Sequence, residues 1–335
     1  MAGNPSARAE RAPRILFLTP NVEDYLADSL FHGLRTLLGD RVVDYPKSEI
    51  AYTNYGEERV TALYGRGFTL YGLLEDLPIE RNNLLDRIGE GRFDAVVFAD
   101  IWRRFGTFVE LFPTLGHAKA VALDGHDSEL VYPYAPKWAR RPQWWSLPRA
   151  GRRVTYFKRE LTRRSQALRF LPGFPRLRPI AFSIPEEKII ESPIVKRRDF
   201  PTHIVDGEVA QRLGRESTSY AFGREADYYR DLAEARFGIT TKRAGWDCLR
   251  HYEIAANGTV PCFRNLDRKP PSCAPHGLDD GNCVSYRDYD DLMRKLVTID
   301  DERYASLQAG ALDWARANTT VRRAGEFLAA LELRP

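Results

Sequence analysis

The sequence predicts an α/β protein made of two units, with a parallel sheet in the first. Its 335 residues, 43% of them hydrophobic, are enough to bury two cores. In the first half of the chain, short apolar runs alternate with segments of helical spacing, an order typical of parallel strands joined by right-handed crossovers. No run of roughly eighteen or more apolar residues is present, so we expect no transmembrane span.

The first half contains apolar runs that are short enough to be buried strands. They lie at residues 14–19, 41–45, 93–98 and 118–123. Helical segments are expected between them at residues 22–38, 84–88 and 105–115. Ligands of parallel sheets collect beyond the carboxyl ends of the strands. The loops that follow these strands, at residues 20–21, 100–102 and 124–127, are therefore candidate parts of a site.

A proline-bounded run at residues 179–185 predicts an extended connector between the two units. We therefore place the first unit at residues 13–182 and the second at residues 183–335. The second unit is expected to contain strands at residues 202–205, at 219–222 and from residue 260, and helices at residues 225–237, around residue 253, at 288–296 and at 303–331. Two units joined in this way would face each other across a cleft.

The segment 245–261 carries the densest group of candidate binding residues. Arg250, His251 and Glu253 fall on one short helix, which a glycine ends before the next strand begins. The N–H groups at the start of a helix can bind an anion, and a carboxylate one turn along can accept hydrogen bonds from ribose hydroxyls. The pattern predicts a nucleotide-phosphate site, and an ordinary amphipathic helix with a glycine cap is the alternative.

The run Glu253-Ile-Ala-Ala-Asn-Gly258-Thr-Val-Pro261 resembles the donor-site segment of GT-B glycosyltransferases, in particular the family 4 and exostosin-like groups. The resemblance implies two Rossmann-like domains facing a cleft, with the C-terminal helix packed back on the N-terminal domain. It also implies that Glu253 holds the ribose of a nucleotide-sugar and that Gly258 allows close approach of the backbone. The family 4 pattern has a second Glu eight residues earlier, where this chain has Gly245, and Asp247 is the acid that could replace it.

Other residues near this helix complete the expected donor site. Lys242 and Arg243 precede the Gly245 turn and could neutralise a diphosphate leaving group without a metal, although exposure to solvent is the alternative. His276 lies in a loop rich in proline and glycine and could read a base or a sugar. The expected donor-binding residues are Lys242, Arg243, Trp246, Arg250, His251, Glu253, Gly258 and His276. No cofactor is expected, because the nucleotide-sugar is itself a substrate.

The loop after the fourth expected strand is the candidate catalytic segment. His126 is flanked by Asp124 and Asp127, and a histidine oriented by carboxylates can deprotonate an attacking hydroxyl. The same residues are typical of a tight turn from strand to helix, with Asp127 or Ser128 as the N-cap. Asp100 is a second candidate base, with helix capping as its other role. A retaining route in which the donor phosphate takes the proton needs no such base.

Residues 137–178 carry thirteen Lys or Arg and a single acid, Glu160, a net charge of +12 in a chain whose net charge is only +4. Aromatic side chains are interleaved with these charges. Such a surface attracts a polyanion, anionic lipid headgroups or a phosphorylated acceptor. Alternatively, the arginines face water or pair with some of the 46 acidic residues. Nucleic-acid binding is the less expected of these, because base stacking requires aromatic side chains exposed along a groove and many of these rings are expected to be packed.

The four cysteines of the chain do not form a disulfide scaffold pattern, which favours a reducing cytoplasm. Cys273 and His276 have a spacing that can chelate zinc, and Cys262 and Cys283 could complete a tetrahedral site. The alternative is that the cysteines are buried as small hydrophobic residues.

Two functions from different classes remain. The first is a metal-independent glycosyltransferase of polysaccharide biosynthesis, which moves a hexosyl or related group from a nucleotide-sugar to a glycan, a lipid-linked intermediate or another anionic acceptor. For this enzyme we expect a cytoplasmic location, with peripheral contact at the anionic inner membrane surface. The alternative is a non-catalytic nucleotide- or nucleic-acid-binding protein that uses residues 137–178, with or without a structural zinc.

Overall fold

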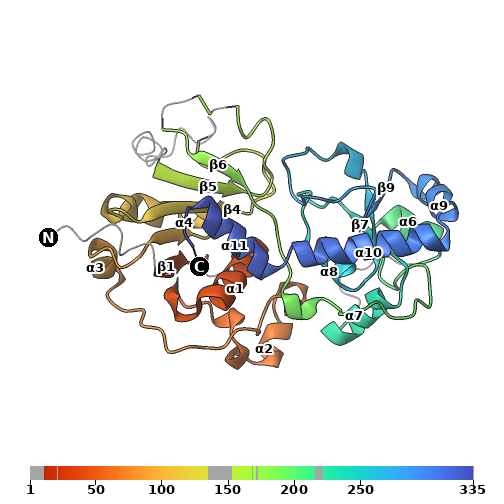
Figure 1. The fold of residues 1–335 in the computed structure, drawn as a ribbon, viewed down its shortest axis with the longest axis horizontal. Helices are drawn as coiled ribbons and strands as arrows, with labels where there is room; N and C mark the ends of the chain where they lie inside the picture. Colours follow the sequence, from red (N-terminus) through yellow and green to blue (C-terminus); the bar gives the residue numbers. More distant parts are fainter. Residues whose placement is uncertain are drawn as a thin grey trace.

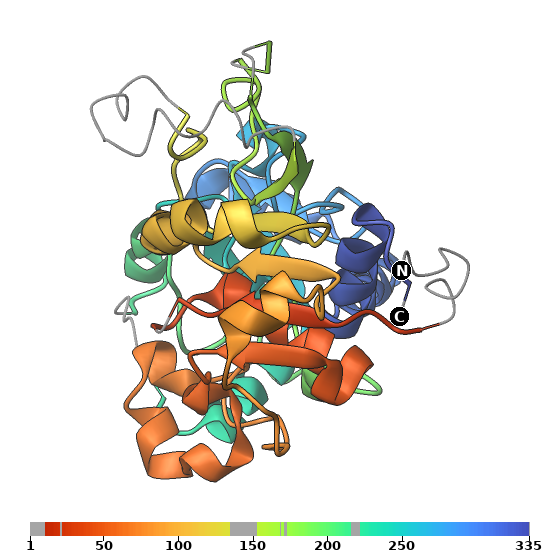
Figure 2. The same ribbon diagram turned by 90° about the vertical axis from the view of Figure 1, so that its left-hand side faces the viewer.

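The computed structural model describes residues 11–20, 22–134, 153–167, 169–170, 173–215 and 222–334. These residues form two α/β units that lie side by side. Figure 1 shows the six-stranded sheet in one lobe and the three-stranded sheet in the other, and Figure 2 looks onto the larger lobe. None of the helices in this described part of the chain is long and apolar enough to cross a membrane.

The first unit is built on a parallel sheet with the strand order β2-β1-β3-β4-β5-β6. Its strands are β1 (Ile15–Leu18), β2 (Val42–Tyr45), β3 (Ala95–Phe98), β4 (Lys119–Asp124), β5 (Val154–Lys158) and β6 (Arg176–Pro179). Alternate side chains enter two different cores: Ile15 and Phe17 lie in one, and Leu16 and Leu18 lie in the other. Helices cover both faces, which explains why the inner strands β1 and β3 are apolar throughout. The strands expected from the apolar runs are β1 to β4.

The main helices of the first unit begin at aspartates. Asp24 precedes α1 (Tyr25–Leu38) and accepts hydrogen bonds from the N–H groups of Leu26 and Ala27, both at 3.0 Å. Asp100 caps α4 (Ile101–Leu111) in the same way. Its carboxylate therefore has the capping role that the sequence offered as the alternative to a catalytic base. The shorter helices are α2 (Glu57–Thr61) and α3 (Leu84–Gly89).

The second unit has a parallel sheet of β7 (Phe237–Thr241), β8 (Val260–Arg264) and β9 (Val284–Tyr286). Its helices are α6 (Gly207–Arg212), α7 (Glu225–Ala233), α8 (Leu249–Ala256), α9 (Tyr289–Val297) and α10 (Asp301–Ala317). The prediction of a strand at residues 202–205 is wrong, because the segment forms no strand. Its first residue is held instead by Asp231, whose carboxylate accepts hydrogen bonds from the N–H and the hydroxyl of Thr202. Part of the strand expected at 219–222 lies outside the described residues.

The helix expected at residues 303–331 is two helices, because the chain breaks at Asn318 and then forms α11 (Thr320–Ala330). As implied by the resemblance, α11 leaves the second unit and packs on α1 of the first. Ala324, Phe327 and Leu328 are buried in the same core as the strands, and the rings of Phe327 and Phe157 are 4.8 Å apart. The two units are thus joined by the connector and by a returning helix.

Gly33 permits the close approach of α1 and α11. A Cβ at this position would lie 1.9 Å from the Thr320 carbonyl oxygen. Because backbone cannot move aside as a side chain can, we expect Gly33→Ala to lower the free energy of unfolding by about 1–3 kcal/mol. Gly106→Ala is the matched control in α4, where nothing lies within 4 Å of the added methyl group. Urea denaturation of the two variants should show a loss only for Gly33→Ala, and equal stability would contradict this packing account.

Candidate functional site

A cavity of about 540 Å³ lies between the two units. Loops at the carboxyl ends of β4, β5 and β7 contribute to it, in agreement with the rule for parallel sheets. Its aromatic lining consists of Tyr25, Tyr64, Phe68, Phe182, Phe222 and Tyr228. Its charged or titratable lining consists of Asp127, Arg159, His203, Arg243, Asp247, Arg250 and Glu253. An apolar cavity with a few convergent charged groups is typical of a small-molecule site.

Glu253 reaches this cavity from α8, with only 7% of its surface exposed. One carboxylate oxygen accepts a hydrogen bond from the Thr69 hydroxyl at 2.6 Å, and the other accepts from the Tyr228 hydroxyl at 2.8 Å. Burial raises the pKa of Glu253, while these two hydrogen bonds and Arg250 act in the opposite direction. The carboxylate is therefore held in one orientation at the wall of the cavity.

Positive charge gathers at the start of α8. The N-cap residue Cys248 lines the cavity, and within the described chain its side chain makes no capping hydrogen bond. Arg243 and Arg250 line the cavity beside it, and the Arg250 Nε is buried without a hydrogen-bond partner among the described residues. The positive end of the helix dipole and two guanidinium groups thus face one region, an arrangement suited to a phosphate or diphosphate.

Three other expected donor residues are placed elsewhere by the structure. His251 is fully buried, donates from Nε2 to the Trp246 carbonyl at 2.9 Å, and accepts at Nδ1 from the Thr240 hydroxyl at 2.9 Å. Burial lowers the pKa of His251 to about 3, so the ring is neutral. The Lys242 ammonium lies 5.2 Å from the centre of the Trp246 ring. His251, Trp246 and Lys242 shape the turn before α8 and do not line the cavity.

Gly258 and His276 also lie outside the cavity lining. Gly258 has φ +62, and a Cβ there would lie 3.0 Å from the Ile190 side chain, so this glycine serves a tight turn after α8. The His276 carbonyl accepts a hydrogen bond from the Trp314 indole at 2.7 Å. Burial lowers the pKa of His276 to about 4. The sequence pattern could not separate these turn positions from ligand contacts.

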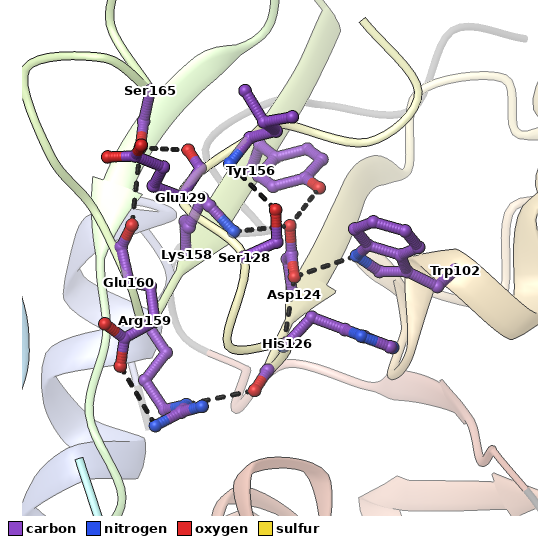
Figure 3. Close-up of polar contacts among 12 residues, drawn as sticks. Trp102, Asp124, His126, Ser128, Glu129, Tyr156, Lys158, Arg159, Glu160 and Ser165 are labelled. Carbon is purple, nitrogen blue, oxygen red and sulfur yellow. Dashed lines mark hydrogen bonds and ion pairs between the residues drawn. The ribbon is translucent and has the colours of Figure 1, made fainter. Parts of the chain in front are cut away.

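Of the three expected catalytic residues, only Asp127 lines the cavity. Asp124 is fully buried and accepts hydrogen bonds from the Trp102 indole at 3.0 Å, the Tyr156 hydroxyl at 2.6 Å and the Lys158 ammonium at 2.9 Å (Figure 3). This enclosed carboxylate does not line the cavity, and its hydrogen bonds hold the loop after β4 in place.

His126 is directed away from Arg159 in Figure 3 and stacks on Trp102 with 4.4 Å between ring centres. Its side chain is 39% exposed and its Nε2 lies 4.0 Å from the Asp100 carboxylate. The structure therefore separates His126 from Asp127, which the sequence had placed in one catalytic group.

The sequence pattern did not reveal Arg159, which lines the cavity, or Glu160, which holds the turn before α8. Arg159 is 2% exposed and forms an ion pair with Asp127; it also donates to the Asp247 carbonyl in the other unit at 2.8 Å. Glu160 accepts from the Trp246 N–H at 2.9 Å and from the Cys273 thiol at 2.9 Å. Their position directly after β5 was the available signal, but β5 was hidden within the run of basic residues.

Gly245 lies where these side chains converge. A Cβ at this position would be 2.5 Å from an Asp127 oxygen, 2.6 Å from a Glu160 oxygen and 2.8 Å from an Arg159 nitrogen. Two carboxylates of the first unit thus occupy the space that a side chain at 245 would need. The Asp247 carboxylate accepts hydrogen bonds from the Phe182 N–H at 2.8 Å and from the Tyr252 hydroxyl at 3.0 Å.

The basic segment 137–178 is only partly described. Five of its cationic residues, Lys137, Arg140, Arg141, Arg149 and Arg152, lie outside the described residues. Lys158 and Arg159 are buried in ion pairs with Asp124 and Asp127, so part of the excess charge is internal.

The cysteines do not gather around a common point. Cys262 is buried in the core of the second unit. Cys283 is buried in the core that also contains Ile15 and Phe327. The Cys273 thiol donates to Glu160. Among the residues that the structure describes, no three His, Cys, Asp or Glu side chains are placed to hold a metal ion. The zinc alternative, with His276 as fourth ligand, therefore has no geometric support there.

No family model and no curated protein matches the sequence. Solved structures match the fold over almost the whole chain. HepE of Anabaena in complex with UDP superposes with a TM-score of 0.59 at 10% identity and covers 95% of this chain and 99% of its own. A glycosyltransferase of Rickettsia africae gives 0.53 at 10% identity, with 96% and 98% covered. An alpha-glucosyltransferase in complex with UDP and a 13-mer DNA gives 0.51 at 11% identity, with 96% and 98% covered.

The fold is of the GT-B type. The expected GT-B architecture is thus confirmed, with two Rossmann-like units, a cavity between them and the last helix on the first unit. Identity this low shows the fold alone, so the finer resemblance to the family 4 and exostosin-like groups stays a prediction.

Proposed function

We propose that this chain is a glycosyltransferase that uses a nucleotide-sugar as its donor. The observation that carries the proposal is the cavity between the two units of a GT-B fold, where the start of α8, Arg243 and Arg250 lie beside the Glu253 carboxylate. The structural neighbours support it, because HepE has been crystallised with UDP and with UDP-glucose, and the alpha-glucosyltransferase with UDP.

The diphosphate, the ribose and the base of the donor each have a chemically matched partner in this cavity. Arg243, Arg250 and the N-terminal end of α8 would bind the diphosphate and stabilise its charge as it leaves, which requires no metal. Glu253 would accept hydrogen bonds from the ribose hydroxyls. The aromatic side chains around Glu253, including Phe68 and Tyr228, offer an apolar surface for the base.

The transfer step would break the bond between the anomeric carbon and the diphosphate oxygen, whose electron pair stays with the nucleoside diphosphate. An acceptor hydroxyl oxygen would form the new bond to that carbon. Asp127 is the best-placed of the expected bases to take the hydroxyl proton, because it lines the cavity and Arg159 holds it there. Asp124 and His126 would then support the loop from behind.

The acceptor that we propose is a hydroxyl of a glycan, a lipid-linked intermediate or another anionic molecule. The described part of the basic segment supports an anionic partner: Arg163 and Arg169 are exposed, and Phe170, next to Arg169, is 75% exposed. Arg164 is also exposed but is paired with Glu129 at 2.7 Å. Arginines beside an exposed aromatic ring suit a headgroup surface. Peripheral contact of a cytoplasmic enzyme with an anionic membrane would follow from this surface.

Two adjacent cations give the test of the diphosphate site. Arg243 lines the cavity, whereas Lys242 lies over Trp246 outside it. We expect Arg243→Ala to weaken binding of a nucleoside diphosphate about tenfold, because a charge-assisted hydrogen bond is lost. Lys242→Ala removes the same charge and should change affinity less than about twofold. Isothermal titration at fixed ionic strength measures both.

Wild-type protein is first titrated with nucleoside diphosphates that differ in their base, and the one that binds most tightly is used to compare the variants. Equal losses of nucleotide affinity in the two variants would mean that binding depends only on the overall positive charge of this region. That outcome would favour the alternative of a polyanion binder that uses the basic segment.

A further inference from the structure

A segment of the first unit reaches into the second unit at Glu253. It runs through residues 64–72, directly after α2, which Figure 1 places on the side of the first unit that faces α7. Phe68 stacks on Tyr228 with 6.1 Å between ring centres, and Leu70 and Tyr71 share a small core with Leu249 of α8. The segment is therefore seated by apolar contacts on both sides of Thr69.

Thr69 is only 1% exposed and has three polar contacts with the second unit. Its N–H donates to Glu225 at 2.5 Å, and its hydroxyl donates to Glu253 at 2.6 Å. The Tyr229 hydroxyl lies 2.8 Å from the Thr69 oxygen. Because the single hydroxyl hydrogen of Thr69 is given to the carboxylate, Tyr229 must be the donor in the last contact. Glu225 is in turn held by Lys188 at 2.6 Å.

The backbone at Thr69 is strained. Its φ is +78, which is rare for any residue other than glycine and rarer still for a β-branched one. Gly65, Gly67 and Gly72 of the same segment also have positive φ, as does Arg66, so the whole segment is tightly turned. Thr69 differs from them because it is β-branched, and its side-chain contacts with the second unit offset the strain of its backbone.

Hydrogen bonds to Glu253 leave room for a ligand. An ionised carboxylate has about four lone-pair positions. Thr69 and Tyr228 fill one on each oxygen, so about two remain, which matches the two vicinal hydroxyls of a ribose. Both donors also favour the charged form of a carboxylate whose pKa burial raises.

We propose that Thr69 is a positioning residue for ribose recognition, supplied to the donor site by the opposite unit. The Thr69 hydroxyl holds one oxygen of Glu253 in place, so that the remaining lone pairs of the carboxylate point into the cavity. Donor affinity then depends on the two units being closed, because Thr69 and Glu253 belong to different units. This inference rests on the proposed function and adds to it a residue that senses closure.

The test compares ribonucleotides with their 2′-deoxy and 3′-deoxy analogues in full-length variants. The probe is the nucleoside diphosphate that binds wild type most tightly, measured by isothermal titration. Wild type should prefer the ribonucleotide about tenfold, the value of one hydrogen bond to a charged group. In Thr69→Val and Thr69→Ala, which lack the hydroxyl, the preference should fall below about twofold. Thr69→Ser restores the hydroxyl and should restore the preference.

Thr61→Val is the matched control, because among the described residues the Thr61 hydroxyl bonds locally, to the Glu58 carbonyl in α2. A merely structural role for Thr69 would weaken binding of all the analogues equally and leave the preference intact, which would overturn the inference. If the folded wild-type protein bound no nucleotide, the proposed function itself would be contradicted. Melting curves show that each variant is folded before it is titrated.

Discussion

A Glu253→Ala variant is expected to bind nucleotide-sugar about a hundredfold more weakly than the wild-type protein. The carboxylate would supply two charge-assisted hydrogen bonds to the ribose, and together these account for a loss of this size. The same change leaves the buried hydroxyls of Thr69 and Tyr228 without their acceptor, so the variant should also be less stable by about 1–3 kcal/mol. Isothermal titration and thermal melting separate the two effects.

Glu253→Gln keeps the shape of the side chain but removes the charge and replaces one acceptor oxygen by an NH2 donor, so it distinguishes ligand contact from packing. Asp227→Ala is the matched control: this carboxylate lies on the neighbouring helix α7, is 43% exposed and does not line the cavity. It should bind donor like wild type. Unchanged donor affinity in a folded Glu253→Ala protein would remove the main support for the proposed site.

The second large effect is expected on stability, from Asp124→Ala. This change leaves the Lys158 ammonium fully buried without its partner, and such a loss costs about 3–5 kcal/mol. Tyr156 and Trp102 also lose their acceptor. Urea denaturation should show the reduced free energy of unfolding. Asp313→Ala, which removes one partner of an exposed pair with Arg316, should cost less than about 1 kcal/mol.

A double-mutant cycle tests the ion pair itself. Asp124→Ala combined with Lys158→Met removes both charges, so we expect the double variant to be more stable than Asp124→Ala alone. Strictly additive losses would show that the two side chains do not interact, and the account of this loop as a buried structural device would be wrong.

The strands β1 to β4 and the helix that carries Glu253 could be predicted because each depends on local patterns. Apolar runs give the strands, and a glycine after a periodic segment gives the end of α8. The residues that bring the two units together could not be found in this way. Thr69 and Glu253 are 184 positions apart, and Arg159 and the Asp247 carbonyl are 88 positions apart. No local pattern links positions so distant.

Three of the expected site residues lie outside the cavity lining for one shared reason. His251, Asp124 and His126 have suitable chemistry, but the sequence shows which side chain is present and not what surrounds it. His251 and Asp124 proved to be enclosed by hydrogen-bond partners, and His126 rests on an indole ring. Burial and orientation depend on neighbours contributed by other elements, which only the assembled fold supplies.

The most direct test of the donor site is a crystal structure of this chain with the nucleoside diphosphate that binds it most tightly. We predict that the diphosphate lies at the start of α8 beside Arg243 and Arg250, with the ribose hydroxyls donating to Glu253. A nucleotide bound along the basic segment, with the cavity between the units left open to solvent, would contradict the proposal.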